Sequence, residues 1–132
     1  MQENIDNETS RYQYDSKDLA IIIPTKDRPK EVERLLKSIC ELDCRVGRII
    51  VVASGQNIHN AVMAYSEKLN IEYFSSESGQ IKQRNVGISL LDDSTKLVAT
   101  MDDDAFFYKT AVSEMILFWN SVEPQTAGVG FN

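Results

Sequence analysis

Short apolar runs alternate with amphipathic segments along most of the chain, from residue 19 onward. The runs cover residues 19–24, 48–53, 71–74, 96–101 and 128–131. The first two are continuous and rich in Ile and Val, which is typical of central strands with both faces covered. This alternation of strand-like and helix-like segments predicts an α/β fold with a mostly parallel sheet of about five strands.

Apolar residues at helical spacing separate the predicted strands. One stripe predicts a helix over residues 29–41, and Pro29 suits its first turn because an N–H there needs no partner within the helix. The members of this stripe are Val32, Leu35, Leu36 and Ile39. Similar stripes predict helical segments over residues 58–69 and 110–122.

The charge of the chain limits its classes of partner. Its 132 residues include 14 Lys and Arg against 20 Asp and Glu, a formal net charge of −6. Phosphate binding along a nucleic acid needs a basic footprint, so we expect no nucleic acid partner. The apolar runs are too short to span a bilayer, and the polar residues 1–18 do not resemble a secretory signal. We therefore expect a cytoplasmic location, or peripheral attachment to a membrane, without a transmembrane segment.

The domain organisation follows from the same pattern. Residues 1–18 carry no apolar periodicity and are expected to form a disordered or loosely attached tail. Residues 19–132 are expected to form one domain. Cys40 and Cys44 are the only cysteines, and no second pair completes a zinc site, so they are predicted to be free thiols.

Polar loops follow the predicted strands. Ligands of an open parallel sheet bind outside the carboxyl ends of its strands, so these loops are the candidates for a site. They cover residues 25–28, 54–57, 75–79 and 102–104. Thr25, Lys26 and Arg28 precede or open a helix, where backbone N–H groups and the helix dipole favour an anion. We expect the four loops to converge on one crevice.

Three consecutive aspartates, Asp102, Asp103 and Asp104, close the fourth predicted strand. On an extended backbone, Asp102 and Asp104 would point to one face about 7 Å apart, and Asp103 to the other. Mg²⁺ or Mn²⁺ takes one or two protein carboxylates and completes its coordination with water and substrate phosphates. The triplet therefore indicates a site for a divalent cation and a sugar hydroxyl, with a solvated acidic loop as the alternative.

A helix after Gly79 would place Ile81, Ile88 and Leu91 on one apolar face, which we expect to be buried, with Arg84 beside it. A guanidinium in such a position needs a partner. Two interpretations stay open: an ion pair with a carboxylate at the edge of the sheet, and an anchor for the diphosphate or base of a ligand.

Four blocks of sequence together resemble the family 2 glycosyltransferases. They are residues 21–29 (IIIPTKDRP), 48–52 (RIIVV), 83–88 (QRNVGI) and 101–104 (MDDD). The resemblance spans residues 19–132 and implies a GT-A fold, a Rossmann-like three-layer sandwich. It also implies inverting transfer of a sugar from a nucleotide-diphospho-sugar to the hydroxyl of a saccharide or lipid-linked acceptor, in the context of bacterial polysaccharide biosynthesis.

The resemblance also assigns residues to the site. It implies that Mg²⁺ or Mn²⁺ is held at the D-x-D motif by Asp102, Asp103 and Asp104. It implies that the nucleotide-sugar contacts residues from the four loops and from the helix after Gly79. These residues are Pro24, Thr25, Lys26, Arg28, Ser54, Gln80, Arg84, Asp102 and Asp103.

The chain departs from the family pattern in two respects. Family members usually carry an acidic residue just after the second strand that reads the nucleobase, and Ala53, Ser54 and Gly55 stand here instead. The catalytic base of the family lies in a second half of the domain, beyond the point that corresponds to Asn132. We therefore expect the 132 residues to bind the donor without transferring the sugar at a useful rate. The alternative is a non-catalytic nucleotide-binding or interaction module.

Overall fold

Four parallel strands form the central sheet of the structure, a computed structural model that describes residues 13–123 and 125–130. The strands are β1 (Leu19–Lys26), β2 (Arg48–Ser54), β3 (Ile71–Ser75) and β4 (Leu97–Thr100), in the spatial order β3-β2-β1-β4. β1 and β2 lie at the centre, where Ile21, Ile22 and Ile50 are fully buried. The continuous apolar runs of these two strands are therefore explained by burial on both faces.

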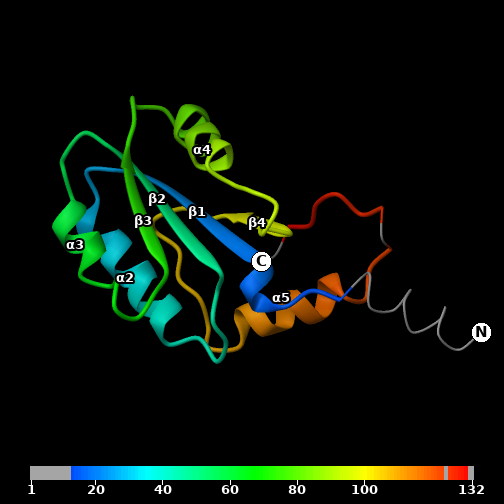
Figure 1. Ribbon diagram of the computed structural model, residues 1–132. Coiled ribbons are helices and arrows are strands. Elements are labelled where there is room, and N and C mark those ends of the chain that lie inside the picture. The colour runs from blue at the N-terminus through cyan, green and yellow to red at the C-terminus, as the bar shows by residue number, and fades with distance from the viewer. Residues whose placement is uncertain (1–12, 124, 131–132) are drawn as a thin grey trace, which may run out of the picture.

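Helices cover both faces of the sheet and make a three-layer arrangement (Figure 1). They are α2 (Pro29–Cys40), α3 (His59–Met63), α4 (Gln80–Ser89) and α5 (Ala111–Trp119), preceded by the 3₁₀ helix η1 (Ser16–Asp18). α4 packs against β1 and β2 on one face. On the other face, α2, α3 and α5 contribute Leu36, Val62 and Ile116 to one hydrophobic core.

The buried face of α4 differs from the one that its apolar residues predict. Ile81 and Ile88 are 73% and 49% exposed, whereas Gln83 and Gly87 are buried against the sheet. A Cβ added at Gly87 would lie 2.6 Å from the Cγ2 atom of Ile22, so glycine allows the helix to approach β1 closely. The prediction of a buried Ile81, Ile88 and Leu91 face is therefore wrong, because close backbone approach and hydrogen bonding decide how this helix is oriented.

Arg48 fixes the other end of α4. Its guanidinium donates to both carboxylate oxygens of Glu72 at 2.8 and 2.9 Å, and its Nη1 atom donates to the carbonyl of Leu90 at 3.0 Å. The hydrogen bonds with Glu72 raise the pKa of the Arg48 guanidinium above its ordinary value. The start of β2 is thereby joined to β3 and to the residue that ends α4.

The described residues at the two ends of the chain contribute no strand to the sheet. Residues 1–12 lie outside the described residues, and within the expected tail Tyr14 packs edge-on against Trp119, with ring centroids 6.3 Å apart. Residues 128–130 form no strand, and Phe131 lies outside the described residues, so the expected fifth strand is not found in the described part. A Cβ at Gly128 or Gly130 would meet nothing within 4 Å, because this segment has no neighbouring strand with which to pair.

Candidate functional site

The carboxyl ends of β1, β2 and β4 lie at one edge of the sheet, because all the strands are parallel. Thr25 is near the end of β1, and its Oγ1 atom donates a hydrogen bond of 2.8 Å to Oδ2 of Asp103, which follows β4. The other oxygen of Asp103 lies 3.5 Å from Nη1 of Arg28. Since Thr25 and Asp103 are only 4% and 7% exposed, these contacts compensate a carboxylate that has been removed from water.

The acidic triplet forms a turn rather than an extension of β4. The strand ends at Thr100, and the carbonyl of Asp102 accepts a hydrogen bond of 3.1 Å from the N–H of Ala105. Asp103 is buried while Asp102 and Asp104 are exposed, so the triplet still divides between two sides. Arg34 of α2 donates to the carbonyl of Asp104 at 2.9 Å and thereby ties the turn to that helix.

Arg84 reaches this turn from α4. Its Nη2 atom lies 3.5 Å from Oδ1 of Asp102, which is the ion pair with a sheet-edge carboxylate that the sequence allowed. Its Nε atom is buried and has no hydrogen-bond partner in the described part of the chain. The Arg84 side chain is nevertheless 35% exposed, so the ion pair with Asp102 does not exclude a contact with a ligand.

Gln83 connects the same strand ends, although the sequence did not single it out as a functional residue. Its Nε2 atom donates to the carbonyls of Thr25 and Val52, both at 2.8 Å. Its Oε1 atom accepts from the Oγ of Ser54 at 3.4 Å and from the N–H of Gly79 at 3.2 Å. A signal was present in the sequence, because Gln83 lies one helical turn before Gly87 and so shares its face.

The other predicted donor-binding residues lie around this cluster. Lys26 is exposed at the end of β1 and donates to the Oγ of Ser78 at 3.1 Å. Gln80 is exposed in the first turn of α4, and Pro24 is buried within β1. The structure thus gathers Thr25, Arg28, Ser54, Arg84 and the acidic turn at one edge. The side chains of Pro24, Thr25 and Ser54 are buried there.

The donor set of the acidic turn bears on the predicted metal. In residues 13–123 and 125–130, no three His, Cys, Asp or Glu side chains gather as a metal cage. Asp102 and Asp104 are nevertheless exposed oxygen donors on one turn. They fit a hard cation that takes one or two carboxylates and its other ligands from water and phosphate. Asp103 is already engaged by Thr25 and Arg28.

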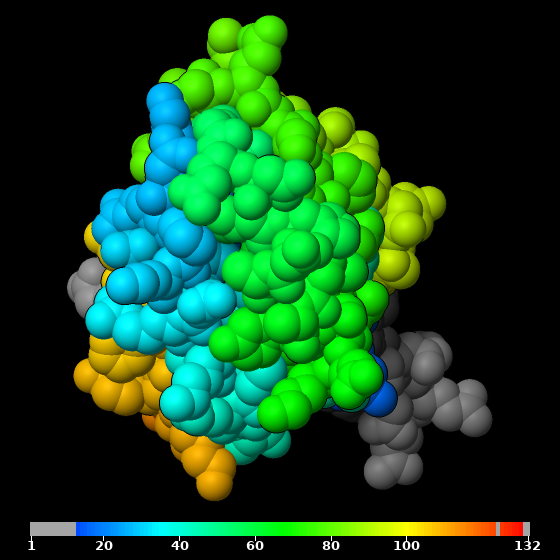
Figure 2. All heavy atoms as spheres, turned by 90° about the vertical axis from the view of Figure 1, so that its left-hand side faces the viewer, coloured from blue at the N-terminus to red at the C-terminus, as the bar shows by residue number. Residues whose placement is uncertain are grey.

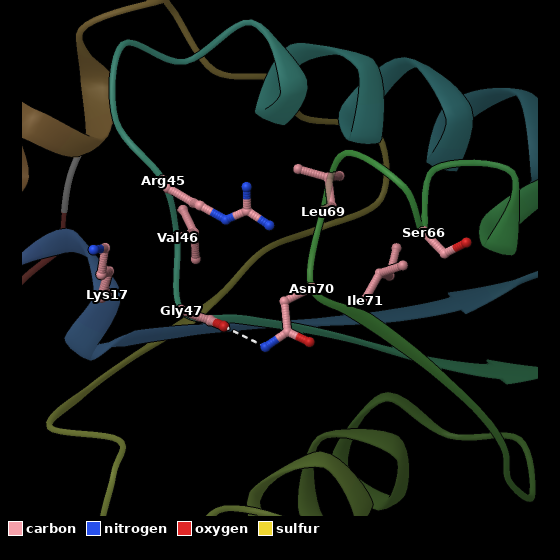
Figure 3. A pocket seen from close by; sticks show the side chains of 8 residues that line it. All are labelled: Lys17, Arg45, Val46, Gly47, Ser66, Leu69, Asn70 and Ile71. Atoms are coloured by element: carbon pink, nitrogen blue, oxygen red, sulfur yellow. Dashed lines mark hydrogen bonds between the residues drawn. The ribbon is translucent and has the colours of Figure 1, made fainter.

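Cavities on the surface of the described residues bear on the position of the site. A cavity of about 520 Å³ lies at the amino edge of the sheet, away from the predicted site, and its lining includes Lys17, Arg45 and Asn70 (Figure 3). Figure 3 shows that the side-chain amide of Asn70 donates a hydrogen bond to the carbonyl of Gly47. The carboxyl edge contains none of these residues, so this larger cavity is not the predicted donor site.

A second cavity, of about 350 Å³, adjoins the carboxyl edge. Pro29 and the segment from Gln56 to Ala61 line it, between the loop after β1 and the start of α3. Figure 2 shows this side of the molecule, where α2, in light blue to cyan, lies beside α3, in green. The lining thus includes Gln56 and Asn57 from one of the four loops that the sequence predicted to converge, and Pro29, which follows another.

The sequence matches the family model described as glycosyl transferase family 2 over residues 20–131. The chain belongs to glycosyltransferase family 2. The predicted family is thereby confirmed. A comparison with curated proteins finds no match. Within the described residues, no helix is both long enough and apolar enough to cross a membrane.

Solved structures of glycosyltransferases share this fold. TarS 1-349 of S. aureus superposes with a TM-score of 0.70 at 21% identity, over 86% of this chain and 38% of TarS. The same protein in complex with UDP-GlcNAc gives 0.68 at 25% identity, over 76% of this chain and 30% of TarS. The mannosyltransferase PcManGT of Pyrobaculum calidifontis, in complex with GDP-Man and Mn²⁺, gives a TM-score of 0.67 at 17% identity. This match covers 92% of this chain and 40% of PcManGT. The GT-A fold is therefore confirmed, and the chain spans about two fifths or less of these proteins.

Proposed function

We propose that these 132 residues bind a nucleotide-diphospho-sugar at the carboxyl edge of β1, β2 and β4, for inverting transfer of the sugar to an acceptor hydroxyl. Membership of glycosyltransferase family 2 supports sugar transfer as the reaction class. Similar structures have been obtained with UDP-GlcNAc and with GDP-Man, which supports a UDP- or GDP-linked donor. The acceptor is a saccharide or a lipid-linked saccharide, as in the assembly of a bacterial polysaccharide. We propose the cytoplasm or the membrane periphery as the location of the protein.

One observation carries the proposal: an incompletely paired guanidinium lies beside exposed carboxylates at the edge where ligands of parallel sheets bind. Arg84 contacts Asp102 at 3.5 Å, and its side chain is 35% exposed. Arg28 lies 3.5 Å from Asp103 of the same turn, and its side chain is about half exposed. A diphosphate needs cationic donors and a sugar needs carboxylate acceptors, and both are present here.

Each group has a role in the departure of the nucleotide. Breaking the bond between the sugar and the diphosphate builds negative charge on the leaving phosphate, and Arg84 stabilises that charge. Asp102 accepts a hydrogen bond from a hydroxyl of the sugar or ribose. Asp102 and Asp104 would hold Mn²⁺ or Mg²⁺, and Asp103 would join them only after losing its contacts with Thr25 and Arg28. The metal would supply Lewis-acid neutralisation of the diphosphate when bound.

Inverting transfer also needs a general base on the opposite face of the sugar. The carboxylates of the acidic turn serve the donor side, and we assign the base to none of the residues that the structure describes. The 132 residues are therefore proposed to bind the donor without transferring its sugar at a useful rate.

The roles of Asp102 and Asp104 can be tested with the double variant D102N/D104N. Binding of UDP or GDP to the unaltered chain should strengthen when Mn²⁺ is added, and the double variant should lose this dependence. The variant E67Q/D93N is a matched control, because it removes two exposed carboxylates outside the acidic turn. Unchanged Mn²⁺ dependence in D102N/D104N would show that the acidic turn is a solvated loop that does not bind the metal.

A further inference from the structure

Asp27 has an unusual backbone conformation at the centre of the carboxyl edge. Its φ is +54°, the only positive φ of a residue other than glycine in the described part of the chain. The left-handed region is unfavourable for a residue with a Cβ, although Asp and Asn tolerate it better than most. The loop between β1 and α2 thus holds its one acidic residue in a strained conformation, and none of the contacts described above accounts for it.

This conformation places the carboxylate of Asp27 over the loop that follows β2. Its Oδ1 atom accepts a hydrogen bond of 2.6 Å from the N–H of Gln56. A Cβ at Gly55, whose φ is +74°, would lie 2.5 Å from the same oxygen and 2.9 Å from Oδ2. Glycine at position 55 is therefore required for the carboxylate to occupy this place.

A cavity close to Asp27 is lined by two of its neighbours, although Asp27 itself is not among the lining residues. Gln56, its hydrogen-bond partner, and Pro29, two residues along the chain, both line the cavity of about 350 Å³. Asn57 and His59 line the same cavity, and the His59 ring is held edge-on to Tyr73 with centroids 5.4 Å apart. Asp27 is exposed, and no partner for its Oδ2 atom is found among the described residues, so this oxygen is available to a ligand.

We propose that Asp27 is a specificity-determining residue that accepts a hydrogen bond from a ring N–H of the nucleobase. This inference rests on the proposed function, because it concerns the nucleotide of the same donor. A carboxylate is only an acceptor of hydrogen bonds. Uracil and guanine present a ring N–H on their pairing edge, at N3 and N1. Cytosine and adenine present a lone pair at the corresponding atom, which a carboxylate repels. Asp27 thus selects uracil and guanine nucleotides.

A role limited to joining the two loops predicts a different outcome on substitution. The amide side chain of the variant D27N keeps an oxygen that can accept from the N–H of Gln56, and asparagine tolerates a positive φ. Its Nδ2 atom, however, puts a donor where Oδ2 was. A joining role leaves the order of base affinities unchanged. A base-reading role weakens the binding of uracil and guanine and favours the bases with a ring acceptor.

The test measures the affinities of UDP, GDP, CDP and ADP by calorimetry, with Mn²⁺ present, for the unaltered chain, D27N and D27G. We expect the unaltered chain to bind UDP or GDP more tightly than CDP and ADP. In D27N, this ratio of affinities should fall by about tenfold, the loss expected for one hydrogen bond to a charged group. D27G fits a φ of +54° without strain, so it should fold and also lose the preference. D93N, which removes one exposed carboxylate elsewhere, should keep it.

The outcomes separate this inference from the proposed function. If the unaltered chain binds all four nucleotides equally, or if D27N and D27G keep the original order, the role of Asp27 is overturned and donor binding stands. If the unaltered chain binds none of the four, the proposed function is overturned, and the role of Asp27 with it.

Discussion

Thr25 and Asp103, 78 residues apart in the chain, are joined by a buried hydrogen bond of 2.8 Å between the Oγ1 atom of Thr25 and Oδ2 of Asp103. The bond ties the end of β1 to the turn that carries the predicted sugar and metal ligands. It therefore links the stability of the fold to the geometry of the site. Asp103 has a structural role in this arrangement, whereas Asp102 and Asp104 face outward.

Replacement of Thr25 by valine should destabilise the protein. T25V keeps the shape of the side chain but leaves Asp103 without its buried donor, and a hydrogen bond to a charged group contributes about 1.5–3 kcal/mol. Urea denaturation followed by circular dichroism measures the change in the free energy of unfolding. T25S, which retains the hydroxyl, is the matched control and should lose less. Equal stability of T25V and the unaltered chain would show that Asp103 is satisfied by Arg28 alone.

Gln83 gives a second prediction, because its amide pairs two strand-end carbonyls that no apolar side chain could satisfy. Q83L should lower the free energy of unfolding by about 2 kcal/mol or more, the cost of leaving buried polar groups unpaired. Q80L changes the same residue type at an exposed position of the same helix, so its stability should stay within about 0.5 kcal/mol of the unaltered chain. A similar loss in both variants would mean that the hydrogen bonds of Gln83 contribute nothing specific.

Gly87 gives a third prediction, which concerns the contact between α4 and β1. A methyl group there would lie 2.6 Å from Cγ2 of Ile22. G87A should therefore destabilise the fold by about 1–3 kcal/mol through overpacking, despite the better helix propensity of alanine. G128A adds the same methyl group in open space and should be neutral. The double variant I22A/G87A should recover part of the packing loss of G87A, and additive effects of the two substitutions would contradict a direct contact.

The cysteines give a fourth prediction. Cys40 and Cys44 are free and half-buried, and burial raises the pKa of both thiols above their ordinary value. A raised pKa leaves less thiolate at a given pH, so alkylation by iodoacetamide at about pH 8 should be slower than for an unstructured cysteine peptide. The rate should rise to that of the peptide in urea. Equal rates in the folded and unfolded states would contradict the burial of these thiols.

The sequence predicts the parts of this fold that depend on hydrophobic burial. β1 and β2 are continuous apolar runs, and α2 follows the stripe of Val32, Leu35, Leu36 and Ile39. All three elements were therefore predicted with nearly the observed bounds. Asp103 is buried while Asp102 and Asp104 are exposed, although the triplet forms a turn and not the extended backbone on which the prediction was based. Burial patterns have a period that can be read along the chain.

The remaining features depend on contacts between distant segments. The orientation of α4 is set by hydrogen bonds from Gln83 to two strand ends and by the space that Gly87 leaves for Ile22, and neither produces an apolar stripe. The apolar residues 128–131 predicted a strand, but a strand also needs a neighbour with which to pair. The hydrogen bond from the N–H of Gln56 to Asp27 joins two loops and has no periodic pattern. The sequence could place the predicted site residues at the ends of strands, but it could not predict their hydrogen-bond and ion-pair partners.

The most direct test of the central claim is a calorimetric titration of the 132-residue chain with UDP-GlcNAc and GDP-Man, each with and without Mn²⁺. We expect saturable binding of at least one of these nucleotide-sugars, stronger in the presence of Mn²⁺, with no release of free sugar beyond that of a blank without protein. Absence of binding to both nucleotide-sugars in the presence of Mn²⁺, by a chain shown to be folded, would contradict it.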